Sequence, residues 1–384
     1  MAIRFDRSWS DPDLDLYRDT VVRFIEEELA PGDEAARRDG HVGHAVWRRA
    51  GELGLLCADI PEDHGGGGGG DFRHEAVVYE EMARRALTGM NTSVHAIVAH
   101  YILNHGTQAQ KQKYLPRMAR GELVGAIAMT EPGTGSDLQA IRTRAERTPD
   151  GGWRIDGSKT FISNGYLAGL VLVACKTDPA QRARGISILI VETAQAPGFR
   201  VGRMLAKMGL KAQDTSELFF DGVQVPAENL LGGEEGQGFR QLMSDLPYER
   251  LIIGVMALAA MEGAYEATLR YVREREVFGK PLAEQQNTRF KLAEIATQIA
   301  AGRAFIDQCV HRLLAGTLDT ATASMAKLWG SETQGRVIDE CLQLFGGYGF
   351  MDEYPISRMY TDARVQRIYG GTSEIMKEVI ARAL

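Results

Sequence analysis

The sequence predicts a mainly α-helical α+β protein in three parts: helices, then a β-domain, then a helix bundle. Residues 11–120 carry apolar side chains at three- and four-residue spacing, which is typical of amphipathic helices. Short segments rich in β-branched residues, separated by Gly, Pro, Asp and Asn, then run from 122 to 235. Helical spacing returns near 236. Strands and helices do not alternate, so a doubly wound parallel sheet is not expected.

The first part, residues 1–121, is predicted to be a helical domain. Helical spacing is clearest in LYRDTVVRFIEEELAP, HAVWRRAGELGLL and HEAVVYEEMARRAL, and Pro31 ends the first of these segments. The glycine run 65–70 cannot form a stable helix and is predicted to be a surface loop. It satisfies the dinucleotide pattern GxGxxG only trivially, because no apolar strand leads into it.

The second part, residues 122–235, is predicted to be a compact antiparallel β-domain. Its strands are expected in ELVGAIAMT, GWRIDGSKTFISN, GLVLVACKT, GISILIVET and SELFFDGVQVP. The third part, residues 236–384, is predicted to be a four-helix bundle with short links. Its helices are expected at 237–274, 283–315, 319–345 and 372–384.

Composition narrows the possible partners. The formal net charge of −7 argues against nucleic acid, because there is no basic excess to neutralise phosphates. No run approaches the ~20 apolar residues that span a bilayer, so no membrane segment is expected. The cysteines (4 in all) form no CxxC pair or Cys/His cluster, so free buried thiols are expected and no metal site. The polar, acidic N-terminus does not resemble a signal peptide, which predicts a cytoplasmic or equivalent reducing compartment.

Five polar, glycine-rich segments are candidates to line a cleft between the helices and the β-domain: 128–137, 159–165, 275–280, 343–350 and 367–374. The first offers hydroxyls and backbone N–H groups that suit a heterocycle edge or a phosphate, although taken alone it is better explained as a plain turn. The glycines of the fourth allow close approach of a ligand or cap a helix. The last places two glycines before a Thr-Ser helix start, which favours an anion.

Their joint order is more specific than any one segment. MTEPGTGSD, GSKTFISNG, REREVFGKPL, LQLFGGYGF and IYGGTSEI together resemble the signature segments of the acyl-CoA dehydrogenase family, across essentially the whole chain. That family has an N-terminal helical domain, a middle β-domain and a C-terminal four-helix bundle, in agreement with the pattern above. The resemblance implies FAD as cofactor and an acyl-CoA as substrate.

The resemblance also implies which residues bind FAD. Those expected at the flavin ring and its phosphates are Met129, Thr130, Gly135, Ser136, Phe161 and Ser163. Phe161 takes the place of an aromatic, commonly tryptophan, that packs beside the ring, so packing is kept but an N–H is lost. Those expected at the ADP half, partly across a subunit interface, are Arg275, Phe278, Gln286, Gln343, Gly347, Thr372 and Glu374. A homo-oligomer of at least two chains follows, and the usual family assembly is a tetramer.

The catalytic base is the most informative point of the resemblance. Many family members have a glutamate directly after the tyrosine of the IYxGT segment, but here that position is Gly370. A minority, including the isovaleryl and long-chain dehydrogenases, carries the glutamate on another helix, and Glu249 in LPYERL matches that pattern. Taken alone, Glu249 would be a solvated helix residue. Because position 370 has no glutamate and position 249 does, Glu249 is expected to be the base. Arg250 is expected either to orient it, to bind substrate or to be structural.

The implied reaction is α,β-dehydrogenation of an acyl-CoA to the trans-2-enoyl-CoA. Glu249 would remove the α-proton, and the β-hydrogen would leave as hydride to flavin N5. The Gly370 backbone N–H and the flavin ribitol 2′-hydroxyl would bind the thioester carbonyl, with Ser136, Arg250 and Tyr369 also expected at the substrate. Electrons would pass to electron-transferring flavoprotein.

Several alternatives stay open. The substrate acyl group could be held by a carrier protein, or the chain could be a catalytically dead flavoprotein subunit, as Gly370 suggests. An acyl-CoA oxidase is less expected, because such chains are typically longer. The acyl chain is not readable from the sequence. The segment 91–96 is expected near the pocket floor, where His95 would either cap a short pocket or be a core residue.

Overall fold

The computed structural model describes residues 5–67 and 70–384, so positions 68–69 of the glycine run lie outside the described residues. The first part is helical, as predicted: α1 (Pro12–Phe24), α2 (Asp33–Asp39), α3 (His44–Glu52), α4 (Phe72–Arg84), α5 (Thr92–His105) and α6 (Gln108–Ala119). Side-chain caps explain where four of these helices begin. Asp11, Asp71, Asn91 and Thr107 each accept a hydrogen bond from a backbone N–H in the first turn of their helix.

The middle part forms a seven-stranded sheet. Its strands are β1 (Gly125–Ala128), β2 (Arg144–Arg147), β3 (Trp153–Ser163), β4 (Leu170–Lys176), β5 (Ile186–Glu192), β6 (Phe199–Met204) and β7 (Thr215–Val225). The five predicted strands are all present. The short strands β2 and β6 were not predicted, since RAER and FRVGRM show little alternation of apolar and polar residues.

The sheet is mixed, which corrects the expectation of a purely antiparallel β-domain. β1 and β2 pair with β4 in parallel, whereas β2–β3, β3–β7, β6–β7 and β4–β5 are antiparallel. The chain leaves β1, crosses the sheet through β2 and β3, and only then returns as β4. A connection of this length can bring two strands together in the same direction.

The last part contains α7 (Gly238–Ser244), α8 (Leu246–Glu274), α9 (Gln286–Leu314), α10 (Thr320–Phe345), α11 (Pro355–Ala363) and α12 (Ser373–Ala381), with the two-stranded hairpin β8 (Glu276–Val277) and β9 (Lys280–Pro281). The predicted helix 237–274 is broken at Asp245, and Pro247 lies in the first turn of the new helix, where its missing N–H costs nothing. The prediction missed α11. The break places Glu249 at the start of α8.

Helix α8 is the central helix of the molecule. It packs on α4, α9 and α10, and most of its residues are buried. Within residues 5–67 and 70–384, α8 is the one helix long and apolar enough to cross a membrane by length and composition, a match that the sequence analysis did not expect. However, 83% of its apolar window is buried inside the protein, as in the core helix of a globular domain.

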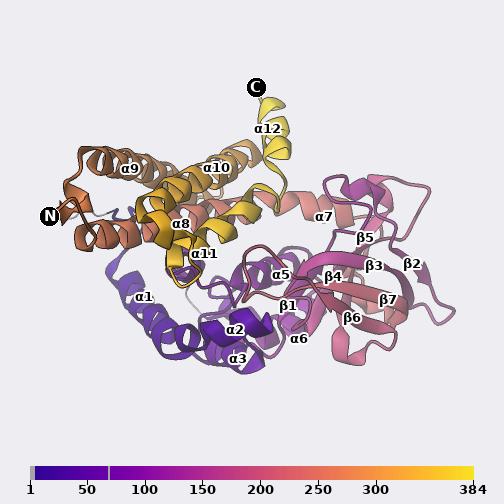
Figure 1. Ribbon diagram of the computed structural model, residues 1–384. Helices are drawn as coiled ribbons and strands as arrows, with labels where there is room; N and C mark the ends of the chain where they lie inside the picture. The colour runs from indigo at the N-terminus through magenta and orange to yellow at the C-terminus, as the bar shows by residue number, and fades with distance from the viewer. Residues whose placement is uncertain (1–4, 68–69) are drawn as a thin grey trace.

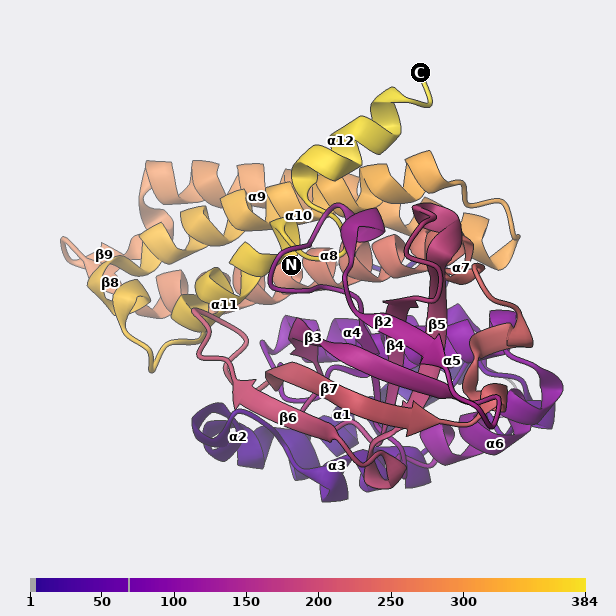
Figure 2. The same cartoon turned by 90° about the vertical axis from the view of Figure 1, so that its right-hand side faces the viewer.

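Figures 1 and 2 show the arrangement of the three parts. The N-terminal helices and the C-terminal helices lie on either side of α8, the sheet lies beside both, and α12 projects outward with the C-terminus. A buried ionic network fixes α8 against its neighbours: Arg303 on α9 donates to Glu262 on α8 (2.6 Å) and to Glu80 on α4 (2.7 Å). The middle of α8 is therefore fixed against α4 and α9.

Candidate active site

Glu249 lies in the first turn of α8 and is 7% exposed. Its carboxylate Oε1 accepts a hydrogen bond from the hydroxyl of Tyr101 on α5, at 2.8 Å. The start of a helix favours negative charge, because its backbone N–H groups are not used within the helix. Glu249 is thus a buried carboxylate with a defined partner, not the solvated helix residue that the sequence alone would also allow.

The surroundings of Glu249 raise its proton affinity. Burial raises the pKa of Glu249 to about 7, and the Asp245 carboxylate one turn earlier adds to the effect. The Tyr101 hydrogen bond and the Arg250 charge act in the opposite direction. Asp245 is itself held from α5, by Asn104 Nδ2 at 3.1 Å and His105 Nε2 at 3.2 Å. A carboxyl with a pKa near 7 is suited to accepting a proton at neutral pH.

Gly370 lies against the same part of α8. A Cβ at this position would come within 2.4 Å of Ile253 Cδ1, one helical turn beyond Glu249, and the backbone has φ +61°. The segment is fixed by Lys327, whose Nζ donates to the Gly371 carbonyl at 2.7 Å. Gly370 therefore lies beside α8 one helical turn beyond Glu249.

Tyr369 and Arg250 flank this region in different ways. Burial and the Asp362 carboxyl raise the pKa of Tyr369, so its hydroxyl stays protonated. Arg250 is 3% exposed and points to α10, where its Nη1 donates to Ser324 Oγ at 2.9 Å. Its Nε has no partner among the described residues. Among the described residues, Arg250 forms no ion pair with Glu249. This favours a role for Arg250 other than direct orientation of the base.

The ends of β1 and β3 hold the first group of expected flavin residues together. The Thr160 N–H donates to the Thr130 carbonyl at 3.0 Å, and Lys159 Nζ donates to the Met129 carbonyl at 3.0 Å. Lys159 also forms a buried ion pair with Glu131 at 2.9 Å. The backbone of 129–130 is thereby fixed beside the 160–163 segment.

Phe161 stands out within this group. It is 67% exposed and has φ +59°, a conformation that is unfavourable for a bulky residue. The pairing of β3 with β7 shifts register between Lys159 and Ile162, so the strand bulges at this point. Backbone strain of this kind concentrates at functional sites. The neighbouring Ser163 accepts a hydrogen bond from Gln213 Nε2 at 3.1 Å, and Gly135 and Ser136 are exposed.

The second group of expected flavin residues lies at the other end of α8. Phe278 is 97% exposed with φ +50°, and the Arg275 guanidinium lies 5.8 Å from the Tyr348 ring centroid. Gln286, Gln343 and Gly347 are exposed at the adjacent helix ends. Arg275 follows Glu249 by 26 positions, which at 1.5 Å per residue is about 39 Å. The second group therefore lies far from Glu249 of the same chain.

The third expected segment forms the start of α12. Thr372 is the N-cap, and its Oγ1 accepts a hydrogen bond from the Ile375 N–H at 3.3 Å. Glu374 is exposed in the first turn, and Gly371 before the cap has φ +90°. The sequence prediction of a capped helix start after two glycines is confirmed here.

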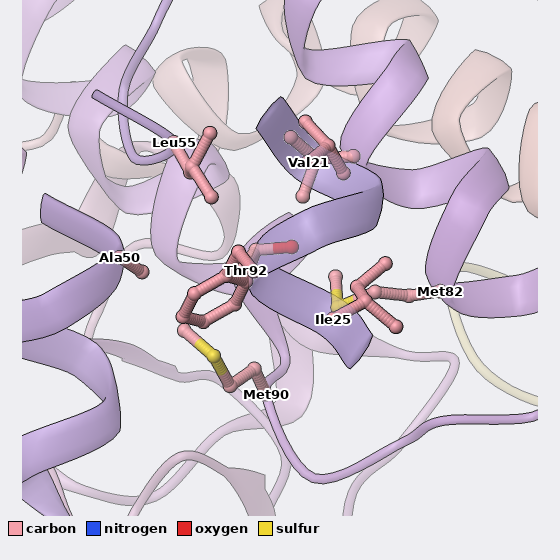
Figure 3. Close-up of a pocket in the computed structure, with 9 residues that line it drawn as sticks. Val21, Ile25, Ala50, Leu55, Met82, Met90 and Thr92 are labelled. Carbon is pink, nitrogen blue, oxygen red and sulfur yellow. The ribbon is translucent and has the colours of Figure 1, made fainter. Parts of the chain in front are cut away.

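Two cavities in the described residues lie away from Glu249. One is apolar and lies among the N-terminal helices (Figure 3), lined by Val21, Phe24, Ile25, Ala50, Leu55, Val78, Met82, Met90 and Thr92. The other is a polar groove between α9 and α10 that contains Lys291, Glu294, Arg336 and Glu340. The first is lined by no titratable group and has room for about one water molecule. Thr92 belongs to the 91–96 segment expected near the pocket floor.

His95 is a core residue. It is fully buried, its Nδ1 accepts a hydrogen bond from the Gly125 N–H at 3.1 Å, and its Nε2 donates to the Met118 carbonyl at 3.1 Å. Burial lowers the pKa of His95 to about 4, so the ring is neutral. These bonds tie α5 to α6 and β1, which decides between the two roles left open by the sequence.

The remaining expectations concern metals and thiols. Within the described ranges, no group of three His, Cys, Asp or Glu side chains is placed to bind a metal ion. All four cysteines are buried free thiols, as predicted: Cys57, Cys175, Cys309 and Cys341.

Comparison with known proteins assigns the family. Three domain models match in order: acyl-CoA dehydrogenase, N-terminal domain at 11–122, middle domain at 126–223 and C-terminal domain at 236–384. The chain belongs to the acyl-CoA dehydrogenase family. It is thus a member of a family of FAD-dependent oxidoreductases, and the sequence prediction of family and fold is confirmed.

Individual family members extend the match over nearly the whole chain. The mouse (Mus musculus) mitochondrial long-chain specific acyl-CoA dehydrogenase is 50% identical over 373 residues, covering 96% of this chain and 86% of that protein. The crystal structure of an acyl-CoA dehydrogenase from Geobacillus kaustophilus has a TM-score of 0.94 and 44% identity, covering 98% of this chain and 99% of that one. A glutaryl-CoA dehydrogenase from Mycobacterium smegmatis in complex with FADH2 has a TM-score of 0.89 and 30% identity, covering 97% and 95%.

Two residues of the region around Glu249 escaped the sequence analysis. Tyr101 precedes Glu249 by 148 positions, and Asp245 is an ordinary residue two positions before Pro247. Neither belongs to a signature segment or to a pattern with a chemical meaning. Only the packing of α5 on the start of α8 brings them to the carboxylate.

Proposed function

We propose that this member of the family dehydrogenates an acyl-CoA thioester between its α- and β-carbons, with Glu249 as the base and FAD as the cofactor. The observation that carries the proposal is the state of Glu249: a buried carboxylate at a helix start, with its pKa raised to about 7 and a tyrosine partner. Gly370 has no side chain to compete for this role. A solvated structural glutamate would have neither the burial nor the partner.

The described residues fit FAD in two respects. Two of the non-glycine residues with positive φ, Phe161 and Phe278, are exposed aromatics in the expected flavin segments, where a planar ligand would cover them. The glycines at 346, 347 and 135 have open space around them, so a ligand can approach the backbone. When bound, FAD would supply the acceptor for the β-hydrogen, which leaves as hydride.

The flavin ring would lie at Met129, Thr130, Phe161 and Ser163, with Gly135 and Ser136 near the phosphates. Arg275 lies about 39 Å from Glu249, at the other end of α8, so we propose that Arg275, Phe278, Gln286, Gln343 and Gly347 serve the FAD of a second chain. Thr372 and Glu374 would lie near the pyrophosphate and adenine. The functional unit would be at least a dimer and, as is usual in the family, a tetramer.

The chain's own groups would handle the proton and the charge. The Gly370 N–H would donate to the thioester carbonyl oxygen, where negative charge develops as the α-proton leaves. Glu249 would accept that proton, and the burial of its carboxylate would keep competing water away. Ser136, Arg250 and Tyr369 would contact the substrate. The product would be the trans-2-enoyl-CoA, with electrons passing on to electron-transferring flavoprotein.

We also propose the finer assignments that follow. The 50% identity with a long-chain specific relative supports a long acyl chain as the first substrate class to test. The domain division would be 1–121, 122–235 and 236–384. Buried free thiols support a cytoplasmic or equivalent reducing compartment.

The test is an anaerobic titration of the purified flavoprotein with acyl-CoAs of increasing chain length, plus isovaleryl-CoA and citronellyl-CoA, while the flavin absorbance is followed. Wild type should bleach, whereas Glu249→Gln should bind flavin but not bleach; Glu27→Gln, an exposed glutamate, is the control. Equal bleaching by wild type and Glu249→Gln would refute Glu249 as the base. Bound flavin with no bleaching by any CoA ester would refute the acyl-CoA reaction in favour of a carrier-bound substrate or a dead subunit.

A further inference from the structure

The contact between Tyr101 and Glu249 joins two parts of the protein that are far apart in sequence. Tyr101 belongs to α5, is fully buried, and lies in the N-terminal helical part, whereas Glu249 begins the central helix of the last part. A buried phenol needs a hydrogen-bond partner, since an unpaired one costs free energy. Here the partner is the carboxylate assigned to the chemistry, at 2.8 Å.

Tyr101 has a second acceptor within reach. Its hydroxyl lies 3.3 Å from the Leu242 carbonyl at the end of α7, as well as 2.8 Å from Glu249 Oε1. One O–H can serve only one of these well, and an ionised carboxylate is the stronger acceptor. Once Glu249 is protonated, the Leu242 carbonyl becomes the better acceptor. The hydroxyl can therefore hold the charged base and release the neutral one without being left unpaired.

The same face of α5 also positions a negative charge, whose effect on the pKa of Glu249 is opposite to that of Tyr101. Asn104 and His105 hold the Asp245 carboxylate, which lies one turn before Glu249 and repels its negative charge. The groups that act on Glu249 are Tyr101 from α5, Asp245 at the start of α8 and Arg250 on α8 itself. Tyr101 and Asp245 act with opposite sign, and both are positioned by α5.

We propose that Tyr101 is a positioning residue for the base, holding the ionised Glu249 carboxylate for attack on the α-proton, and that Asp245, held by Asn104 and His105, acts against it. This inference rests on the proposed function, because it assumes that Glu249 is the base. It adds a role for α5, a helix that contains none of the signature segments.

The test measures the rate of anaerobic flavin reduction by a reactive acyl-CoA from pH 5.5 to 9 in three holoenzymes. In wild type the rate rises with pH as Glu249 loses its proton. Tyr101→Phe removes a bond to the charged form, so the midpoint of this rise should move up by about one pH unit, and the rate at pH 6 should fall roughly tenfold. Asp245→Asn removes a repelling charge, so its midpoint should move down.

The opposite directions separate this role from a structural one. Variants that merely disturb packing would lose rate equally at every pH. An unmoved midpoint in Tyr101→Phe would overturn the inference. A shift of the midpoint in the same direction in Tyr101→Phe and Asp245→Asn would also overturn it. Tyr114→Phe is the matched control, because its buried hydroxyl has no partner among the described residues and its removal should leave the midpoint in place.

Flavin content, measured by absorbance, confirms that each variant is the loaded enzyme. Glu249→Gln is measured beside them. If it still reduces its flavin, the proposed function fails; if it does not and the midpoints fail to move, only the role of Tyr101 fails.

Discussion

The burial of Glu249 has a cost in stability that can be measured. A carboxyl group whose pKa is about 7 in the folded protein and 4.5 when exposed binds its proton more tightly in the folded state. Its contribution to the free energy of unfolding is therefore greatest below pH 4.5 and is lost as the pH rises through 7. At about 1.4 kcal/mol for each pH unit, the loss amounts to about 3 kcal/mol.

Glu249→Gln should recover this free energy, because the amide is neutral at every pH and its oxygen can still accept the Tyr101 hydrogen bond. For 384 residues, an unfolding entropy of about 2.1 cal/mol/K per residue converts 3 kcal/mol into about 4 °C. The expected result is a variant whose Tm exceeds that of wild type by about 1 °C at pH 5 and by about 4 °C above pH 8.

The assay is thermal unfolding of the two holoenzymes across pH 5 to 8.5, with Glu27→Gln as the exposed control, for which the difference from wild type should be flat. Titrating groups that do not interact with Glu249 contribute equally to wild type and variant and cancel in the difference. A difference that does not change with pH, or a wild type that is the more stable protein at pH 8.5, would refute the reasoning about this carboxylate.

Three further predictions concern the flavin segments. Phe161→Ala should weaken FAD binding by roughly tenfold, because the ring is expected to pack against the flavin. The Tm of the apoprotein should stay unchanged, because the ring is 67% exposed. Fluorescence titration with FAD measures the affinity, and an unaltered affinity would remove Phe161 from the site. Gly370→Ala should destabilise the protein by about 1–2 kcal/mol, because φ is +61° and Ile253 Cδ1 lies in the way; a denaturation midpoint equal to that of wild type would contradict this. Phe278→Asp should reduce both flavin retention and oligomer mass, which sedimentation measures. The far-ultraviolet circular dichroism spectrum should stay unchanged. A flavin-replete assembly of normal mass would argue against a role of Phe278 at a second chain.

Much of the fold follows from the sequence because long periodic segments determine it. The helices α9 and α10 and the five apolar strands have strong patterns, so their positions were predictable to within a few residues. The break at Asp245 was not predicted, although Pro247 is a signal for a helix start. The parallel pairing of β1 with β4 depends on how the chain crosses the sheet, which no local pattern encodes.

Among the residues of the candidate site, too, some could be proposed from the sequence and others could not. The sequence offers Glu249 as a candidate because the family motif has an empty position at Gly370, and Phe161 because a signature segment contains it; both roles remain predictions. Tyr101 was not predictable, since a tyrosine in an apolar helix is an ordinary core residue until its partner is known. His95 shows the same limit, because the Met118 carbonyl and the Gly125 N–H that bind it lie elsewhere in the chain.

The central claim is that Glu249 removes the α-proton, and hydrogen exchange tests it without the redox step. An acyl-CoA in which sulfur replaces the β-carbon has no β-hydrogen to transfer, so only proton removal and return remain. Incubated in D2O with the holoenzyme, this compound should gain deuterium at the α-carbon, as detected by mass spectrometry. The account predicts rapid deuterium uptake with wild type and none above background with Glu249→Gln at equal flavin content; equal uptake with both would contradict it.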